Sequence, residues 1–86
     1  MEAYEKIIEL CRKYIHGKIE IQTFQEALEK MILPDACKKT LEKIQHNAVN
    51  KLEEIRFCYD LKNQHKHAQI VAENLMLEIE QYMSSN

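Results

Sequence analysis

Three cysteines and four histidines are the residues of this chain that could bind a metal ion. A structural zinc site needs ligands in closely spaced pairs such as Cys-x2-Cys, and the sequence contains no such pair. His65 and His67 are two residues apart, so on a helix their side chains would diverge, and only a turn would bring them together. We therefore expect no metal and no cofactor, and we interpret His65 and His67 as part of a solvated turn.

The thiols could instead act as nucleophiles, which requires an exposed, electropositive setting and a positioned base. Cys11 and Cys37 fall on apolar stripes, so we interpret them as small buried hydrophobic residues. Cys58 follows Arg56 and Phe57 on the flank of a predicted helix, and a redox role for it stays open. An odd number of widely spaced cysteines favours reduced thiols and a cytoplasmic protein.

Carboxylates are the remaining candidates for chemistry. Glu42, Glu53 and Asp60 fall along one side of the predicted third helix. General acid–base catalysis needs two groups that converge on a cleft with shifted pKa values, whereas acids on an exposed helix side face water. We interpret this side as solvated, or as a surface for binding a protein partner, and we predict that the chain is not an enzyme.

The fourth predicted helix carries a second candidate surface. Ile70 and Leu77 are seven residues apart and point away from the apolar stripe, with Glu73 and Glu80 beside them. Acids that steer a partner and aliphatic side chains that anchor it would make these four residues a docking surface. The alternative is that Ile70 and Leu77 are buried by the first or second helix in a wide bundle.

Apolar residues at steps of three and four predict the elements that position these side chains. We predict an all-α fold, a compact antiparallel four-helix bundle with helices over residues 3–16, 21–33, 35–60 and 64–83. Residues 1–86 form a single domain, because the chain is shorter than the roughly 100 to 150 residues typical of one domain. The third apolar stripe consists of Cys37, Leu41, Ile44, Ala48, Leu52, Ile55 and Tyr59.

The single glycine marks the first corner. Gly17 follows His16 and predicts the C-terminal cap of the first helix, because glycine accepts the left-handed backbone angles found there. Thr23 and Glu26 match the spacing of a capping box, so the second helix is expected to begin between Glu20 and Thr23. The segment between the two helices is too short for a strand and has no partner strand.

The other corners are marked by proline and by acidic or amide side chains. Pro34 ends the second helix at the residue before it, and Asp35 is expected at the start of the third helix. Asp60 and Asn63 are candidates for the turn or cap that leads to the fourth helix.

The distribution of charge along the chain indicates which classes of partner to expect. The formal net charge is −2, with seven Lys or Arg against four Asp or Glu over residues 36–66, and three Glu without any Lys or Arg over residues 67–86. No clearly basic face is indicated, so we expect no nucleic-acid partner. No apolar run approaches the roughly 20 residues that span a bilayer, and the N-terminus is acidic and amphipathic, so we expect neither a membrane protein nor a signal peptide.

The segment Leu10–Phe24, LCRKYIHGKIEIQTF, is similar to the opening of bacterial colicin-like immunity proteins of the colicin D type. Gly17, Lys18 and Ile19 carry the match, with the aromatic Phe24 five residues after the isoleucine. The chain length, the helix order and a long later helix also resemble that family. The resemblance implies a cytoplasmic helical bundle that occludes the catalytic domain of a cognate toxin, often a nuclease with a basic active site.

Together these observations predict a non-enzymatic, immunity-type binding protein whose partner is a toxin catalytic domain. The alternative is a structural helical module that acts as a homodimer or as a subunit of a larger assembly. The two differ in the free state, since a monomer favours a free inhibitor and a dimer that is stable at micromolar concentration favours an assembly module.

Overall fold

A computed structural model describes residues 2–31 and 38–85, and the side chains of residues 5–31, 39–82 and 84. It contains the helices α1 (Glu2–Ile15), α2 (Ile21–Lys30), α3 (Lys38–Cys58) and α4 (Leu61–Ser85), and no strand lies in these ranges. The predicted all-α class and the four predicted helices are confirmed.

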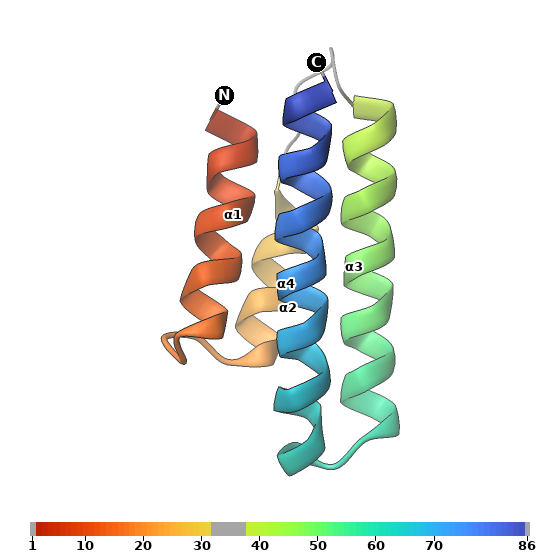
Figure 1. The fold of residues 1–86 in the computed structure, drawn as a ribbon. Helices are drawn as coiled ribbons and strands as arrows, with labels where there is room; N and C mark the ends of the chain where they lie inside the picture. Colours follow the sequence, from red (N-terminus) through yellow and green to blue (C-terminus); the bar gives the residue numbers. More distant parts are fainter. Residues whose placement is uncertain (1, 32–37, 86) are drawn as a thin grey trace.

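The four helices lie alongside one another (Figure 1). The chain runs down α1, up α2, down α3 and up α4, so consecutive helices have opposite directions and both termini lie at one end. α1 packs against α4 and α2, and α3 packs against the same two helices. The molecule measures 38 × 21 × 19 Å, and a helix as long as α4 spans about 37 Å, so α4 sets its length.

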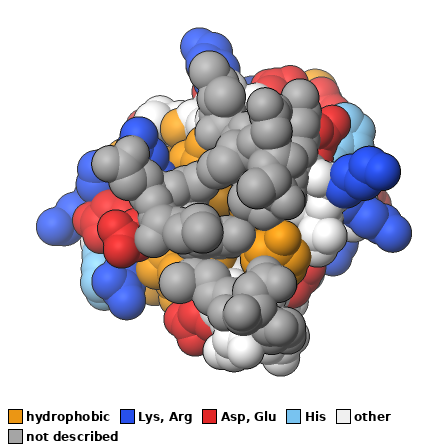
Figure 2. Space-filling model, turned by 90° about the horizontal axis from the view of Figure 1, so that it is seen from above, with side chains coloured by type: hydrophobic (Ala, Val, Ile, Leu, Met, Phe, Trp, Pro, Cys, Tyr) orange, Lys and Arg blue, Asp and Glu red, His pale blue; other side chains and the backbone are white. Residues whose placement is uncertain are grey.

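The apolar stripes of all four helices meet in one core. Tyr14 of α1 and Phe24 of α2 stack with ring centroids 4.9 Å apart and an interplanar angle of 12°. Seen from above, charged side chains lie around the rim and most of the visible hydrophobic ones lie nearer the middle (Figure 2). Burial of apolar surface drives this arrangement. The buried hydrophobic residues are Ile7, Cys11, Tyr14, Phe24, Leu28, Leu41, Ala48, Val49, Leu52, Ile55, Ala68, Ala72, Leu75 and Ile79.

Gly17 forms the predicted corner after α1. Its φ is 75°, in the left-handed region, and its N–H donates to the Tyr14 carbonyl at 3.0 Å. The Lys18 N–H donates to the Lys13 carbonyl at 2.9 Å, which completes the Schellman pair of bonds. A Cβ atom at position 17 would meet nothing within 4 Å, so the backbone angle, and not space, is what requires glycine.

The predicted capping box at the start of α2 is wrong. The N-cap is Glu20, which has extended backbone angles and makes no side-chain cap bond. Thr23 lies inside the helix, and the Glu26 carboxylate accepts a bond from the Gln22 side chain at 2.9 Å. The half-buried Ile21 packs against the core, so apolar burial begins the helix before the threonine.

α2 ends at Lys30, three residues before the predicted end at residue 33. Met31 has extended backbone angles, and the side chain of Gln45 on α3 caps the helix instead. The Gln45 amide donates to the carbonyl of Leu28 at 2.5 Å and to that of Met31 at 3.0 Å. These bonds satisfy carbonyls that the end of a helix leaves unpaired. The predicted boundaries at Pro34 and Asp35 lie outside the described residues.

The corner between α3 and α4 differs from the prediction by two to three residues. α3 ends at Cys58, not residue 60, and α4 begins at Leu61, not residue 64. The Asp60 carboxylate accepts the Asn63 N–H at 3.0 Å, so Asp60 is the N-cap of α4. Tyr59, predicted in the core, is 42% exposed because the helix that would turn it inward has already ended.

Candidate protein-binding surfaces

The outer side of α4 presents two aliphatic side chains to solvent. Ile70 is 50% exposed and Leu77 is 55% exposed, and Glu73 and Glu80 beside them are exposed as well. Of the two alternatives that the sequence left open, exposure is the one that the structure shows, and burial of Ile70 and Leu77 by the first or second helix is wrong. We call Lys66, Ile70, Glu73, Leu77 and Glu80 the outer strip of α4.

Helical geometry explains why these residues share one side. A step of seven residues is close to two full turns, so Leu77 lies almost directly above Ile70, and the core residues Ala72 and Leu75 lie on the opposite side. Ile70 also borders a shallow groove between α4 and α3, where it lies near Ile55. The outer strip thus presents two exposed aliphatic side chains on a helix whose other side is packed in the core.

The charges of the outer strip are only weakly engaged within the chain. The Gln69 amide donates to the Glu73 carboxylate at 3.4 Å, a long hydrogen bond. Lys66 and Glu80 are exposed and have no polar partner among the described residues. Their charges are available to a molecule that docks on α4.

The second predicted acidic surface is not a continuous one. Glu42 and Glu53 are exposed on α3, as predicted. Asp60 lies beyond the end of α3 and caps α4, so the prediction that it belongs to the same side of the third helix is wrong. Glu42 lines a shallow depression together with Lys39 and Lys43, so its charge is partly offset. This side is less acidic than the outer strip of α4.

The turn between α3 and α4 exposes further apolar side chains that the sequence reasoning missed. Phe57 is 80% exposed and Leu61 is 83% exposed, and the Tyr59 ring stacks on His67 with centroids 4.1 Å apart. α3 and α4 extend past the α1–α2 corner at this end, which leaves the turn uncovered (Figure 1). One available signal was that Phe57 falls outside the apolar stripe of the third helix.

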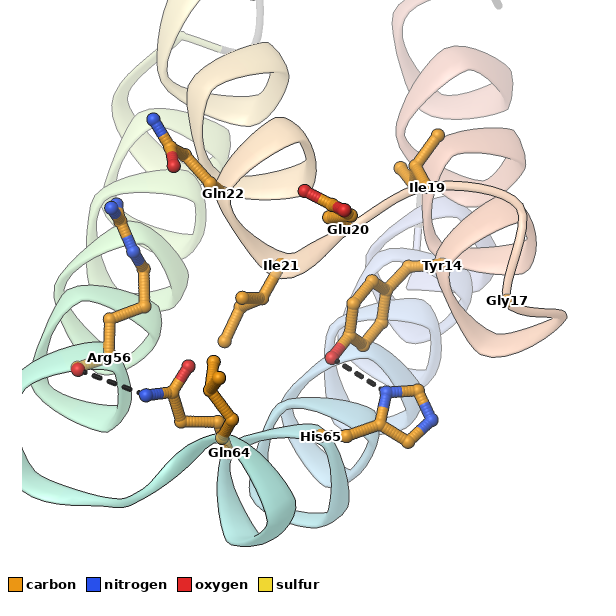
Figure 3. A pocket seen from close by; sticks show the side chains of 10 residues that line it. Tyr14, Gly17, Ile19, Glu20, Ile21, Gln22, Arg56, Gln64 and His65 are labelled. Atoms are coloured by element: carbon orange, nitrogen blue, oxygen red, sulfur yellow. Dashed lines mark hydrogen bonds between the residues drawn. The ribbon is translucent and has the colours of Figure 1, made fainter.

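A hollow of about 590 Å³ lies under the α1–α2 corner, bordered by Tyr14, Ile21, Arg56 and Gln64 among others (Figure 3). The Gln64 amide donates to the carbonyls of Arg56 at 3.2 Å and of Tyr59 at 2.7 Å, and it therefore caps α3. The Arg56 guanidinium donates to the Gln25 side chain of α2 at 2.8 Å. These polar groups hold the helix ends together.

His65, which borders this hollow, and His67 do not form the predicted solvated turn. Both lie inside α4, where His65 Nδ1 is 3.1 Å from the Tyr14 hydroxyl and His67 stacks on Tyr59. Burial raises the pKa of Tyr14, whose hydroxyl is held against this imidazole. Among the described side chains, no three His, Cys, Asp or Glu residues are grouped so that they could hold a metal ion.

The two described thiols lie in opposite environments. Cys11 has no exposed surface, as predicted, and burial raises its pKa to about 12. Cys58 is exposed at the end of α3. The third thiol, Cys37, lies outside the described residues. Cys11 is therefore a packing residue, since a protonated buried thiol is a poor nucleophile.

None of the described helices has the length and apolar character needed to cross a membrane. No protein-family model, curated protein or solved structure matches this chain. The similarity of the first corner to immunity proteins of the colicin D type therefore stays a prediction.

Proposed function

We propose that this chain is a non-enzymatic protein-binding module, and that it acts in the cytoplasm as an immunity-type inhibitor that covers the catalytic domain of a toxin. The observation that carries the proposal is the outer strip of α4, where Ile70 and Leu77 are half exposed next to Glu73 and Glu80. The finer identification of the partner rests on the resemblance at Gly17, Lys18, Ile19 and Phe24.

The physical roles of the strip follow from its composition. Ile70 and Leu77 would anchor the partner, because each can lose its remaining exposed apolar surface on docking. Glu73 and Glu80 would attract a basic surface such as the phosphate-binding site of a nuclease, which raises the association rate. The strip lies on a long regular helix, so binding requires little ordering of the backbone.

The proposal is tested with the catalytic domain of a toxin encoded beside the gene for this chain. The charge-reversal pair Glu73→Lys and Glu80→Lys is expected to slow association about tenfold or more and to flatten its dependence on salt concentration. Stopped-flow fluorescence measures both quantities. The matched control is the pair Glu42→Lys and Glu53→Lys on α3, which is expected to change the rate much less.

Two results would contradict the proposal. Absence of binding between the unmodified chain and such a toxin domain would remove the inhibitor role. Binding that is unaffected by reversal at Glu73 and Glu80, but weakened by reversal at Glu42 and Glu53, would move the binding surface from α4 to α3.

A further inference from the structure

The outer strip of α4 has a symmetric arrangement about its own midpoint. The point halfway between Ile70 and Leu77 lies between Glu73 and Asn74. A basic residue, Lys66, lies four positions before Ile70, and an acidic residue, Glu80, lies three positions after Leu77. Reversing the direction of the strip therefore places aliphatic side chains opposite aliphatic ones and places opposite charges together.

We propose that, in the absence of its partner protein, the outer strip of α4 binds the same strip of a second copy of this chain. The two helices would be antiparallel, with a twofold axis between Glu73 and Asn74. Ile70 of each copy would then face Leu77 of the other. This inference rests on the proposed function only in taking the outer strip as the binding surface, and it names a second copy as the occupant in the free protein.

Charge complementarity selects this occupant and this direction. In the antiparallel register, Lys66 of one copy and Glu80 of the other lie on the same flank and differ in height by about one residue, or 1.5 Å. A parallel arrangement would instead place Lys66 beside Lys66 and Glu80 beside Glu80. A twofold interface requires a self-complementary patch, and the outer strip meets that requirement.

The charge order along α4 supports the same conclusion. Acids near the start of a helix and bases near its end stabilise the helix dipole. α4 has the reverse order, since Lys62 lies in its first turn, no base lies in its last turn and Glu80 lies in its C-terminal part, although Asp60 caps the start. Helix stability in one chain does not account for this order, whereas an antiparallel neighbour would place Glu80 of one copy beside Lys66 of the other.

The register also contains one unfavourable contact. Glu73 lies next to the twofold axis, so it would approach Glu73 of the second copy, and the two carboxylates would repel. Glu73→Gln is therefore expected to strengthen self-association. The same substitution is expected to weaken binding of a basic toxin domain, because it removes an attractive charge. This opposite response separates the two occupants of the strip.

Sedimentation equilibrium of the full chain measures the self-association. The mass is expected to rise with concentration from 10.3 kDa toward twice that value. Lys66→Glu alone and Glu80→Lys alone are each expected to weaken the dimer about tenfold or more, and the double variant is expected to restore it. Lys39→Glu on α3 is the matched control and should leave the mass curve unchanged.

A second pair of substitutions tests the apolar contact. Ile70→Ser with Leu77→Ser is expected to abolish the dimer. Both side chains are about half exposed, so the helical circular dichroism signal should be kept, which separates loss of pairing from loss of folding.

Three outcomes would overturn the self-pairing. The first is a mass of 10.3 kDa up to millimolar concentration. The second is that the Lys66→Glu and Glu80→Lys double variant fails to restore the dimer that each single variant weakens. The third is a dimer that is lost only in the Phe57→Ser and Leu61→Ser double variant. The last result would place the contact at the turn between α3 and α4. These measurements contain no toxin domain, so a monomer that still binds one through Glu73 and Glu80 would reject the self-pairing and keep the proposed function.

Discussion

The inner and outer sides of α4 carry the same kinds of aliphatic side chain under opposite conditions. Leu75 is 2% exposed and Leu77 is 55% exposed, although only two residues separate them. Two residues correspond to about 200° around the helix axis, so one leucine faces the core and the other faces away from it. The role of a leucine in this helix is therefore set by its angular position and not by its type.

This difference separates the side of α4 that packs in the core from the side that is proposed to bind a partner. The buried residues of the inner side, which pack in the core, are Ala68, Ala72, Leu75 and Ile79. The outer strip contributes little to that core. Single exposed aliphatic residues are common on proteins, and the proposed binding role of the outer strip rests on two of them that are aligned on one side beside exposed charges.

The largest expected effect is the difference in the free energy of unfolding between two single variants, Leu75→Ala on the inner side and Leu77→Ala on the outer side. Leu75→Ala should lower the free energy of unfolding by about 2–5 kcal/mol, because it removes buried methyl groups and leaves a cavity. Leu77→Ala should lower it by about 0.5 kcal/mol or less, as is usual for an exposed site. Urea unfolding at low micromolar protein concentration, chosen to minimise self-association, measures both. Equal losses in the two variants would remove the distinction between the two sides.

The thiols offer a smaller test of the same contrast between interior and surface. The pKa of Cys11 is raised by burial from 9.0 to about 12, so the folded state keeps its proton after the unfolded state has lost it. The free energy of unfolding should therefore fall as the pH rises above about 9, by up to about 1.4 kcal/mol per pH unit from this group. Stability from this protonation is fully present below pH 9.

Alkaline unfolding of two variants checks this slope. Cys11→Ala is expected to remove part of the loss of stability between pH 9 and pH 11, and the matched variant Cys58→Ala at the exposed thiol is expected to keep all of it. Tyr14, whose pKa is also raised by burial, adds to the slope in all three proteins. Identical slopes in the two variants would show that the buried thiol does not titrate as described.

The spacing of apolar residues is enough to predict the four helices of this chain, because a small core leaves few other ways to bury them. Gly17 is enough to predict the corner after α1, since its φ of 75° is costly for other residues. The helix ends are less predictable. Gln45 of α3 caps the end of α2 and Gln64 of α4 caps the end of α3, so each cap comes from the following helix, and neither bond has a local signature in the sequence.

The candidate surfaces likewise contain features that the sequence indicates and features that depend on the packing of the helices. The sequence places Ile70 and Leu77 away from the apolar stripe of one helix, but it leaves open whether a neighbouring helix covers them, and the packed structure shows that both are exposed. The exposure of Phe57 and Leu61 depends on how far α3 and α4 extend past the other two helices, which only the packed structure defines. Asp60 does not lie on the predicted acidic side of the third helix, because α3 ends before it.

The central claim is that the outer strip of α4 is a docking surface while the inner side holds the fold. A dilution series of amide proton–nitrogen NMR spectra of the isotope-labelled chain tests it most directly. Concentration-dependent shifts are expected at Lys66, Ile70, Glu73, Leu77 and Glu80, and Leu75 and the rest of the inner side should stay constant. Shifts centred on Phe57 and Leu61, or no shifts up to millimolar concentration together with no response of the strip to a toxin domain, would contradict the claim.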